Sequence, residues 1–477
     1  MTPRRLLPAA AALALLAGPL LPAPAIAAPP EVAVEAAART ALGLTIYNQD
    51  LALVKDRRRV ELAHPRQALA FAEVSPRALP ETVMLATADA GPGLAFGARV
   101  FDFDLLTRER LLEAAVGHEV GIEMPGEETP RRARLLSFNN GQPVLEMDGR
   151  IHAGAPGRII FDGLPPGVRT RPTLLAEVAR PDGSGADREL ELAYLTSGLN
   201  WRADYVAELN SAEDRLDLSA WATLANTTGT DFLGASVKLV AGDLNRARAQ
   251  PVPEMMMARA AGPAESAMEP PQALMGMHVY SVAGPVDLPD RQTRQLALMA
   301  APDIEVRREL IARLPNGVYR GHVGGRADEF PARRDLVFEN TEAAGLGQPL
   351  PAGTVRVYRR DADGDLVFVG EDGLDHTGQG RSVRLTLGED FDVAAKPKQV
   401  SYRKLSDRVF ESQHEVALTN GKGTPVEVRV IAPIPGEWEM LEENHHHQRT
   451  DAATAEWTLT VPAEQAVTLT YAVRARF

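Results

Sequence analysis

The sequence predicts an all-β protein made of several domains. Short runs of β-branched and apolar residues, separated by Gly, Pro, Asn and Asp turn signals, recur from residue 42 to the C-terminus. Apolar and polar residues alternate in segments 189–194, 203–209 and 216–221. This period of two is typical of strands that pack one face against a core. Together these patterns predict a multi-domain β-sandwich protein.

One short helix is predicted at 108–116, with sequence RERLLEAAV. Thr107 can cap its N-terminus and Gly117 can end it. Short candidate strands then follow between Pro-Gly, Asn-Gly and Asp-Gly turns, as far as about residue 161. Segment 105–162 is therefore predicted to be a small β-barrel or meander nested inside the N-terminal domain.

Changes of composition along the chain predict the domain order. The predicted parts are a signal peptide (1–27), a flexible mature N-terminus (28–40), an N-terminal β domain (41–185), a central β-sandwich (186–394) with a disordered Met- and Pro-rich insertion (247–278), and an immunoglobulin-like C-terminal sandwich (395–477).

The first residues have the three parts of a bacterial secretory signal. Arg4 and Arg5 supply positive charge, residues 6–21 are apolar, and residues 25–27 form an A-x-A cleavage site. Prolines interrupt the apolar run, which is also short for a spanning helix. We therefore expect a periplasmic or secreted protein of a Gram-negative bacterium, with no transmembrane segment after cleavage.

The composition excludes several kinds of chemistry. The chain has no cysteine, so disulfides, thiol nucleophiles and cysteine-based metal clusters are impossible. Cleavage removes two arginines and no acid, which takes the formal charge from −13 to −15. Such an acidic protein is poorly suited to binding nucleic acid. No G-x-S-x-G, H-E-x-x-H, P-loop or dinucleotide fingerprint is present, so no catalytic residue and no cofactor are predicted.

Two sequence patterns suggest metal binding. Met275, Met277 and His278 close a Met-rich stretch, and thioethers with an imidazole suit Cu(I). The run 445–447 is three histidines, in which His445 and His447 are the pair that would share one side of a strand. The competing interpretations are a low-complexity loop for the first and a solvated loop tip for the second.

One acidic pattern and three aromatic residues are interpreted as structural. The aspartates at 361, 363 and 365 have the spacing that begins an EF-hand calcium loop. The sixth position of such a loop needs Gly, but here it is Leu366, so a hairpin turn is expected. Trp201, Tyr205 and Trp438 lie in or beside predicted strands and are interpreted as core residues. A sugar-stacking platform is the alternative role for such aromatics.

Several stretches resemble, in order, the domain-of-unknown-function 4139 family in its exported Gram-negative bacterial members. They are LTIYN (44–48), YLTSGLNWRADY (194–205), LANTTG (224–229), VKLVAGD (237–243), LPAGTVRVY (350–358), GEDFD (388–392) and PGEW (435–438). The resemblance implies an exported β-rich protein with no assigned activity and carries over no catalytic residue. Some members resemble mucoidy inhibitor A, which implies envelope or exopolysaccharide biology.

The function predicted from the sequence is non-enzymatic binding or scaffolding in the cell envelope, with an envelope protein or polysaccharide as partner. Exposed strand edges and segment 247–278 are the surfaces expected to take part. Two alternatives stay open. One is an envelope hydrolase that uses an Asp/Glu pair, with or without a divalent ion near Asp243 or near Asp361 to Asp365. The other is copper binding through the Met-rich loop.

Overall fold

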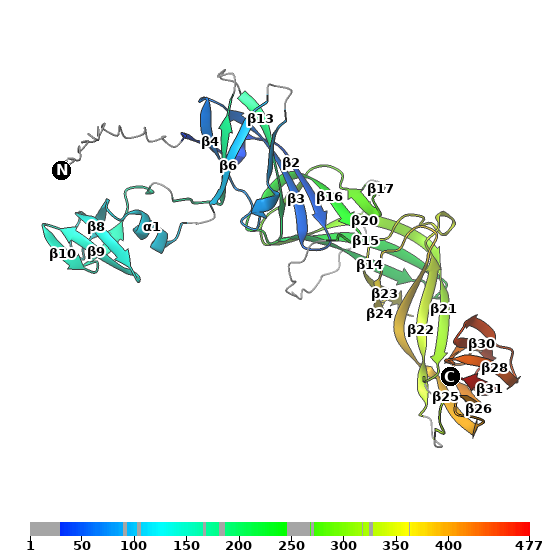
Figure 1. Cartoon of the computed structure of the whole chain (residues 1–477). Helices are drawn as coiled ribbons and strands as arrows, with labels where there is room; N and C mark the ends of the chain where they lie inside the picture. Colours follow the sequence, from blue (N-terminus) through cyan, green and yellow to red (C-terminus); the bar gives the residue numbers. More distant parts are fainter. Residues whose placement is uncertain are drawn as a thin grey trace, which may run out of the picture.

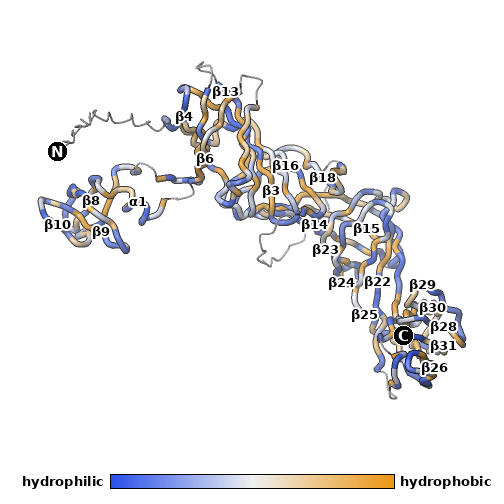
Figure 2. Tube along the Cα trace, viewed as in Figure 1, coloured by the Kyte–Doolittle hydropathy of each residue, from blue (hydrophilic) through white to orange (hydrophobic). Residues whose placement is uncertain are grey.

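The computed structural model describes residues 29–88, 93–102, 106–165, 168–180, 187–245, 268, 271–316, 318–323, 328–361 and 363–477. Figure 1 shows a succession of β-sheets along an elongated molecule, from the blue N-terminal strands to the red C-terminal ones. Figure 2 shows apolar and polar residues following one another along the strands. The predicted all-β, multi-sheet fold is confirmed. The predicted signal segment 1–27 lies outside the described residues.

The first sheet has four strands, in the order β1-β4-β12-β6. They are β1 (Glu31–Val34), β4 (Arg66–Ala72), β12 (Thr173–Ala179) and β6 (Ala95–Asp102). Residues 31–34, expected to be flexible, thus form β1, which pairs in parallel with β4. The side chain of Val34 is buried against the core, and its carbonyl accepts a hydrogen bond from buried Arg58 at 2.8 Å. These contacts explain the order of this segment.

A small unit is inserted between the paired strands β6 and β12. It consists of α1 (Arg108–Ala114), β7 (Glu119–Glu123), β8 (Arg131–Asn139), β9 (Gln142–Met147), β10 (Arg150–Ala153) and β11 (Arg158–Ile160). The predicted helix is confirmed, and Thr107 caps it by accepting from the amide of Arg110 at 3.1 Å. The sheet order is β10-β9-β8-β7-β11, and its end strands are not paired with each other in the described structure. The nested unit is therefore an open meander.

The central sheets pack on each other around one core. The eight-stranded sheet contains β17 (Gln272–Leu274), β18 (Met277–Ser281), β16 (Phe232–Ala241), β2 (Arg39–Tyr47), β3 (Leu51–Glu61), β13 (Asp187–Thr196) and β5 (Met84–Thr87), with β19 (Val286–Leu288) beside β16. The five-stranded sheet contains β20 (Gln292–Glu305), β15 (Arg215–Asn226), β14 (Leu199–Leu209), β23 (Gly353–Arg360) and β24 (Leu366–Leu374). The core continues into the first sheet, so strands on both sides of residue 186 share it.

The last sheet has nine strands. In order they are β28 (Glu437–Glu443), β31 (Gln465–Arg476), β26 (Val409–Asn420), β25 (Ser382–Lys404), β22 (Phe330–Glu339), β21 (Arg307–Arg313), β27 (Val426–Pro433), β30 (Thr454–Val461) and β29 (Gln448–Asp451). Strand β25 runs without a break through residues 394 and 395, where a domain boundary was expected. Its Leu385 packs in the central core and its Val393 packs in the C-terminal core. One strand therefore contributes to two cores.

Short 3-10 helices complete the described elements: η1 (Ala36–Ala38), η2 (Pro80–Thr82) and η3 (Glu342–Ala344). Residues 272–278, at the end of the segment expected to be disordered, form β17 and the start of β18. Strand β18 pairs with β16, which attaches this hairpin to the edge of the central sheet. Among the described residues, no helix has the length and apolarity needed to cross a membrane.

Candidate functional site

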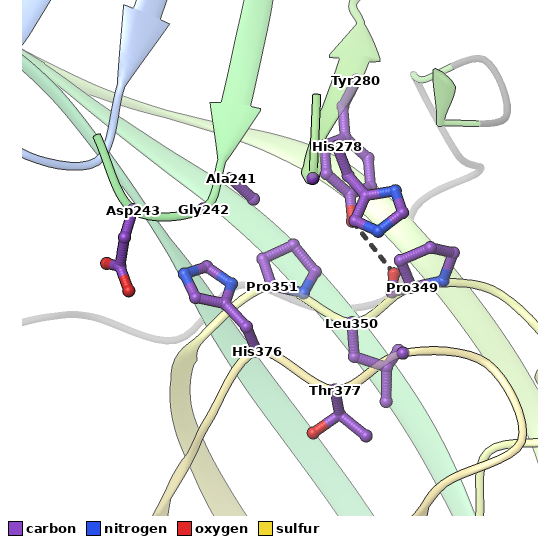
Figure 3. Close-up of a pocket in the computed structure, with 12 residues that line it drawn as sticks. Ala241, Gly242, Asp243, His278, Tyr280, Pro349, Leu350, Pro351, His376 and Thr377 are labelled. Carbon is purple, nitrogen blue, oxygen red and sulfur yellow. Dashed lines mark hydrogen bonds between the residues drawn. The ribbon is translucent and has the colours of Figure 1, made fainter. Parts of the chain in front are cut away.

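Four chain segments enclose a cavity of about 260 Å³ at the end of β16. Figure 3 shows the side chains that line it. The lining residues are Ala241, Gly242 and Asp243 after β16, Gly276, His278 and Tyr280 of the β17–β18 hairpin, Pro349, Leu350 and Pro351 before β23, and His376, Thr377 and Gly378 after β24. Backbone hydrogen bonds between Leu350 and Thr377, at 2.8 and 2.9 Å, join the last two segments.

Three buried aromatic side chains hold the backbone of the cavity wall. The indole of Trp201 donates to the carbonyl of Val240 at 3.0 Å. The hydroxyl of Tyr205 donates to the carbonyl of Pro351 at 2.7 Å, and that of Tyr280 donates to Pro349 at 3.0 Å. Burial raises the pKa of both tyrosines, so these hydroxyls remain protonated donors. The predicted core residues Trp201 and Tyr205 thus also fix the shape of the site.

Replacing Tyr205 with phenylalanine is expected to lower the free energy of unfolding by about 1 kcal/mol. The change leaves the ring in the core but removes the hydroxyl that donates to the Pro351 carbonyl. Thermal unfolding followed by circular dichroism measures the effect. Tyr402→Phe is the control, because that hydroxyl donates to Arg320 at the exposed surface. Equal melting temperatures for the two variants would contradict the proposed support of the wall.

His376 has a fixed orientation in the cavity. Its Nδ1 accepts a hydrogen bond from the amide of Ala352 at 3.1 Å, so a neutral ring carries its proton on Nε2. The amide nitrogen of Asn48 lies 3.3 Å from Nε2, while the buried oxygen of Asn48 has no partner in the described part of the chain. A half-turn of this amide would present its oxygen to the Nε2 proton and satisfy both groups.

Two other polar groups of the cavity have unused hydrogen-bonding capacity. The Nδ1 atom of His278 is buried and has no partner among the described residues. The carboxylate of Asp243 accepts one long hydrogen bond, from Gln49 at 3.4 Å. Gly242 has a φ of +130°, and a Cβ there would lie 3.0 Å from Met277. A larger residue at 242 would therefore displace the hairpin that carries His278.

The candidate copper ligands lie in three different surroundings. Met275 is 94% exposed at the tip of the β17–β18 hairpin. Met277 packs against Gly242, and His278 lines the cavity. Of the remaining methionines of the stretch, Met268 forms an isolated β-bridge with Val282, and those at 255–257 fall outside the described residues. The structure thus brings His278 to a site, but it does not gather Met275 and Met277 around it.

The other sequence patterns also have definite places. The carboxylate of Asp361 accepts from the amides of Asp363 and Asp365, at 3.0 Å each, which forms the turn between β23 and β24. Trp438 lies in the C-terminal sheet, where its indole donates to Ala452 at 2.9 Å. Arg449 stacks on this ring, with its guanidinium carbon 3.9 Å from the ring centre. Trp438 is therefore a core residue and does not line the cavity.

Sequence reasoning missed His376 and Asn48 as site residues. Asn48 and His376 are 328 positions apart and meet only in the folded chain. The sequence did contain an indication of this site. Of the stretches that carry the family resemblance, one ends at Asn48, one ends at Asp243 and one begins at Leu350. These three stretches converge on the cavity, whose lining includes Asp243 and Leu350.

Comparison with protein families gives one match. The sequence pattern described as "Domain of unknown function (DUF4139)" matches residues 190–477, which include all the residues that line the cavity. A comparison with curated proteins finds no match. Because the matched region covers more than half of the chain, the protein belongs to the DUF4139 family.

Proposed function

We propose that this protein is an exported, non-enzymatic binding or scaffolding protein of the Gram-negative cell envelope, and that the cavity beside His376 holds one residue of a neutral polysaccharide. The observation that carries the proposal is that this cavity is lined by two polar side chains with unused hydrogen-bonding capacity, the weakly bonded Asp243 carboxylate and His278, whose buried Nδ1 has no partner among the described residues. Buried polar atoms in proteins normally have a hydrogen-bond partner. A small movement of the imidazole toward a bound ligand would supply the missing one. The signal-like residues 1–27 support export.

The lining of the cavity suits a saccharide. The carboxylate of Asp243 accepts hydrogen bonds from hydroxyls, and the imidazole of His278 can offer a donor or an acceptor. The rings of Pro349 and Pro351 add apolar surface for the C–H groups of a sugar. The volume of about 260 Å³ lies below the range of drug-sized pockets, so a single residue of a polymer fits better than a long segment. The acidic charge of the chain disfavours an anionic saccharide.

Contacts inside the cavity favour binding over hydrolysis. The hydroxyl of Thr377 donates to the carbonyl of Asp375 at 2.8 Å and is not paired with an imidazole, so it lacks the adjacent base of an activated nucleophile. Of the described residues that line the cavity, Asp243 is the one with a carboxylate. Glycoside hydrolysis by the common mechanism needs two carboxyl groups.

Calorimetric titration with neutral oligosaccharides from Gram-negative exopolysaccharide tests the proposal. We expect His278→Ala and Asp243→Asn each to weaken binding about tenfold or more, which is the effect of losing one hydrogen bond to a charged or positioned group. His322→Ala is the matched control, because His322 is an exposed histidine outside the cavity. Absence of saccharide binding to the wild type, or equal affinities for all variants, would overturn the proposal.

A further inference from the structure

A four-residue link, 444–447, joins the two end strands of the nine-stranded sheet. Strand β28 ends the sheet on one side and β29 ends it on the other. In this link the side chains of His446 and His447 converge on Glu443, the last residue of β28. Nδ1 of His446 lies 3.1 Å from Oε1 of Glu443, and Nδ1 of His447 lies 2.9 Å from Oε2. One potential ligand atom from each of the three residues lies within 4.8 Å of the others.

Surrounding groups hold this cluster in place. The indole of Trp457 donates to Oε2 of Glu443 and to the carbonyl of His445, at 3.1 Å each. The amide of His447 also donates to Oε2, at 3.1 Å. Asn444 anchors the link to β31, because its side chain donates to Thr468 at 2.8 Å and accepts from the amide of Thr470 at 2.8 Å. These contacts orient the carboxylate and the link as outer-shell groups do around metal ligands.

Two aromatic rings hold one of the imidazoles in place. The ring of His447 packs against two indoles, with ring centres 5.5 Å from Trp438 and 6.1 Å from Trp457. The cluster therefore combines a hydrogen-bonded carboxylate with an imidazole held by its neighbours.

We propose that Glu443, His446 and His447 bind one divalent transition-metal ion of the zinc type. Ligand atoms about 2.0–2.2 Å from a tetrahedrally coordinated ion lie about 3.3–3.6 Å from one another. The two Nδ1 atoms lie 3.1 and 2.9 Å from the carboxylate oxygens, so each needs to move by only about half an ångström to share an ion with the carboxylate. Two imidazoles and a carboxylate form a ligand set that suits Zn²⁺ and also Cu²⁺ or Ni²⁺.

The site is reachable from solvent on one side. The side chain of His446 is 90% exposed, whereas those of Glu443 and His447 are 17% and 18% exposed. An ion can enter beside His446 and keep a water or another ligand on that side. Figure 1 places β28, β30 and β31 at the end of the molecule that is far from β16 and β17. The metal site is thus separate from the saccharide cavity, and neither proposal depends on the other.

The test is titration of the untagged, signal-free chain with Zn²⁺ in a calorimeter. We expect one ion per chain with micromolar affinity or better. His446→Ala should weaken binding at least about tenfold. Because the side chain of His446 is exposed, this variant should still fold, so the weaker binding reports the loss of a ligand. Glu443→Gln should weaken it similarly. With Cu²⁺, quenching of Trp438 and Trp457 fluorescence should show the same order of affinities.

His445→Ala is the matched control, since His445 belongs to the same run but lies outside the cluster. It should retain the wild-type affinity. If His445→Ala weakens binding as much as His446→Ala, the ion is held by the histidine run without a defined site, and the proposal is wrong. Absence of stoichiometric Zn²⁺ binding to the wild type would also overturn it.

Discussion

Replacing Asp56 with alanine is expected to lower the free energy of unfolding by about 3–5 kcal/mol. Asp56 is 2% exposed in β3 and accepts two hydrogen bonds from Arg39, both at 2.9 Å. Arg58, which is fully buried, donates to it at 2.7 and 3.1 Å. Removing the carboxylate leaves the buried guanidinium of Arg58 without its counter-ion. Denaturant unfolding at pH 7 measures the loss.

The arginine on the other face of the same strand provides the control. Arg59 is exposed, so Arg59→Ala should leave the unfolding midpoint unchanged. The carboxyl of Asp56 is ionised at neutral pH because hydrogen bonds from Arg39 and Arg58 outweigh the effect of burial and lower its pKa. A loss below 1 kcal/mol for Asp56→Ala would show that the ion cluster is not a main support of the central core.

The stability of the C-terminal sheet is expected to fall by about 3 kcal/mol as the pH drops from 6.5 to 4. Burial lowers the pKa of His414 from 6.5 to about 4. Its ring stacks on Tyr471 and meets the edge of Tyr319, with ring centres 5.0 Å away in each case. Between these two pH values the unfolded chain binds a proton that the folded chain does not. Acidification therefore favours unfolding in this window, and this group adds no further loss below it.

A histidine-to-glutamine exchange isolates this contribution. His414→Gln removes the titrating group while keeping a partner for the hydroxyl of Ser412, which lies 2.9 Å from Nε2 of His414. The difference in unfolding free energy between pH 7 and pH 4 should shrink in this variant. The exposed His322 provides the control, since His322→Gln should behave as the wild type does. An unchanged pH dependence in His414→Gln would contradict the assignment.

Local patterns were enough to predict many of the strands and the helix. The alternation in 205–209 appears as buried and partly exposed positions of β14, and Thr107 caps α1 as its residue type indicates. The long-range pairing could not be predicted in this way. Strand β25 joins two cores because β22 pairs with its first part and β26 with its last part, and no local pattern encodes which distant strand will be the neighbour.

The candidate sites were only partly visible in the sequence. His278 was selected for its methionine neighbours, but its place in the wall of the same cavity as Asp243 depends on the pairing of β18 with β16. In the histidine run, strand alternation favoured His445 with His447. The structure instead brings His446 and His447 to Glu443, because residues 444–447 form an irregular link in which neighbouring side chains need not point to opposite faces.

The central claim is that the cavity beside His376 holds a neutral saccharide residue. Nuclear magnetic resonance of the chain labelled at its ten histidines tests it most directly, with His376→Ala used to assign the signals. Addition of saccharide should shift the imidazole signals of His278 and His376 and leave those of His322 and His445 in place. Saccharide binding that leaves the signals of His278 and His376 unmoved would contradict the claim.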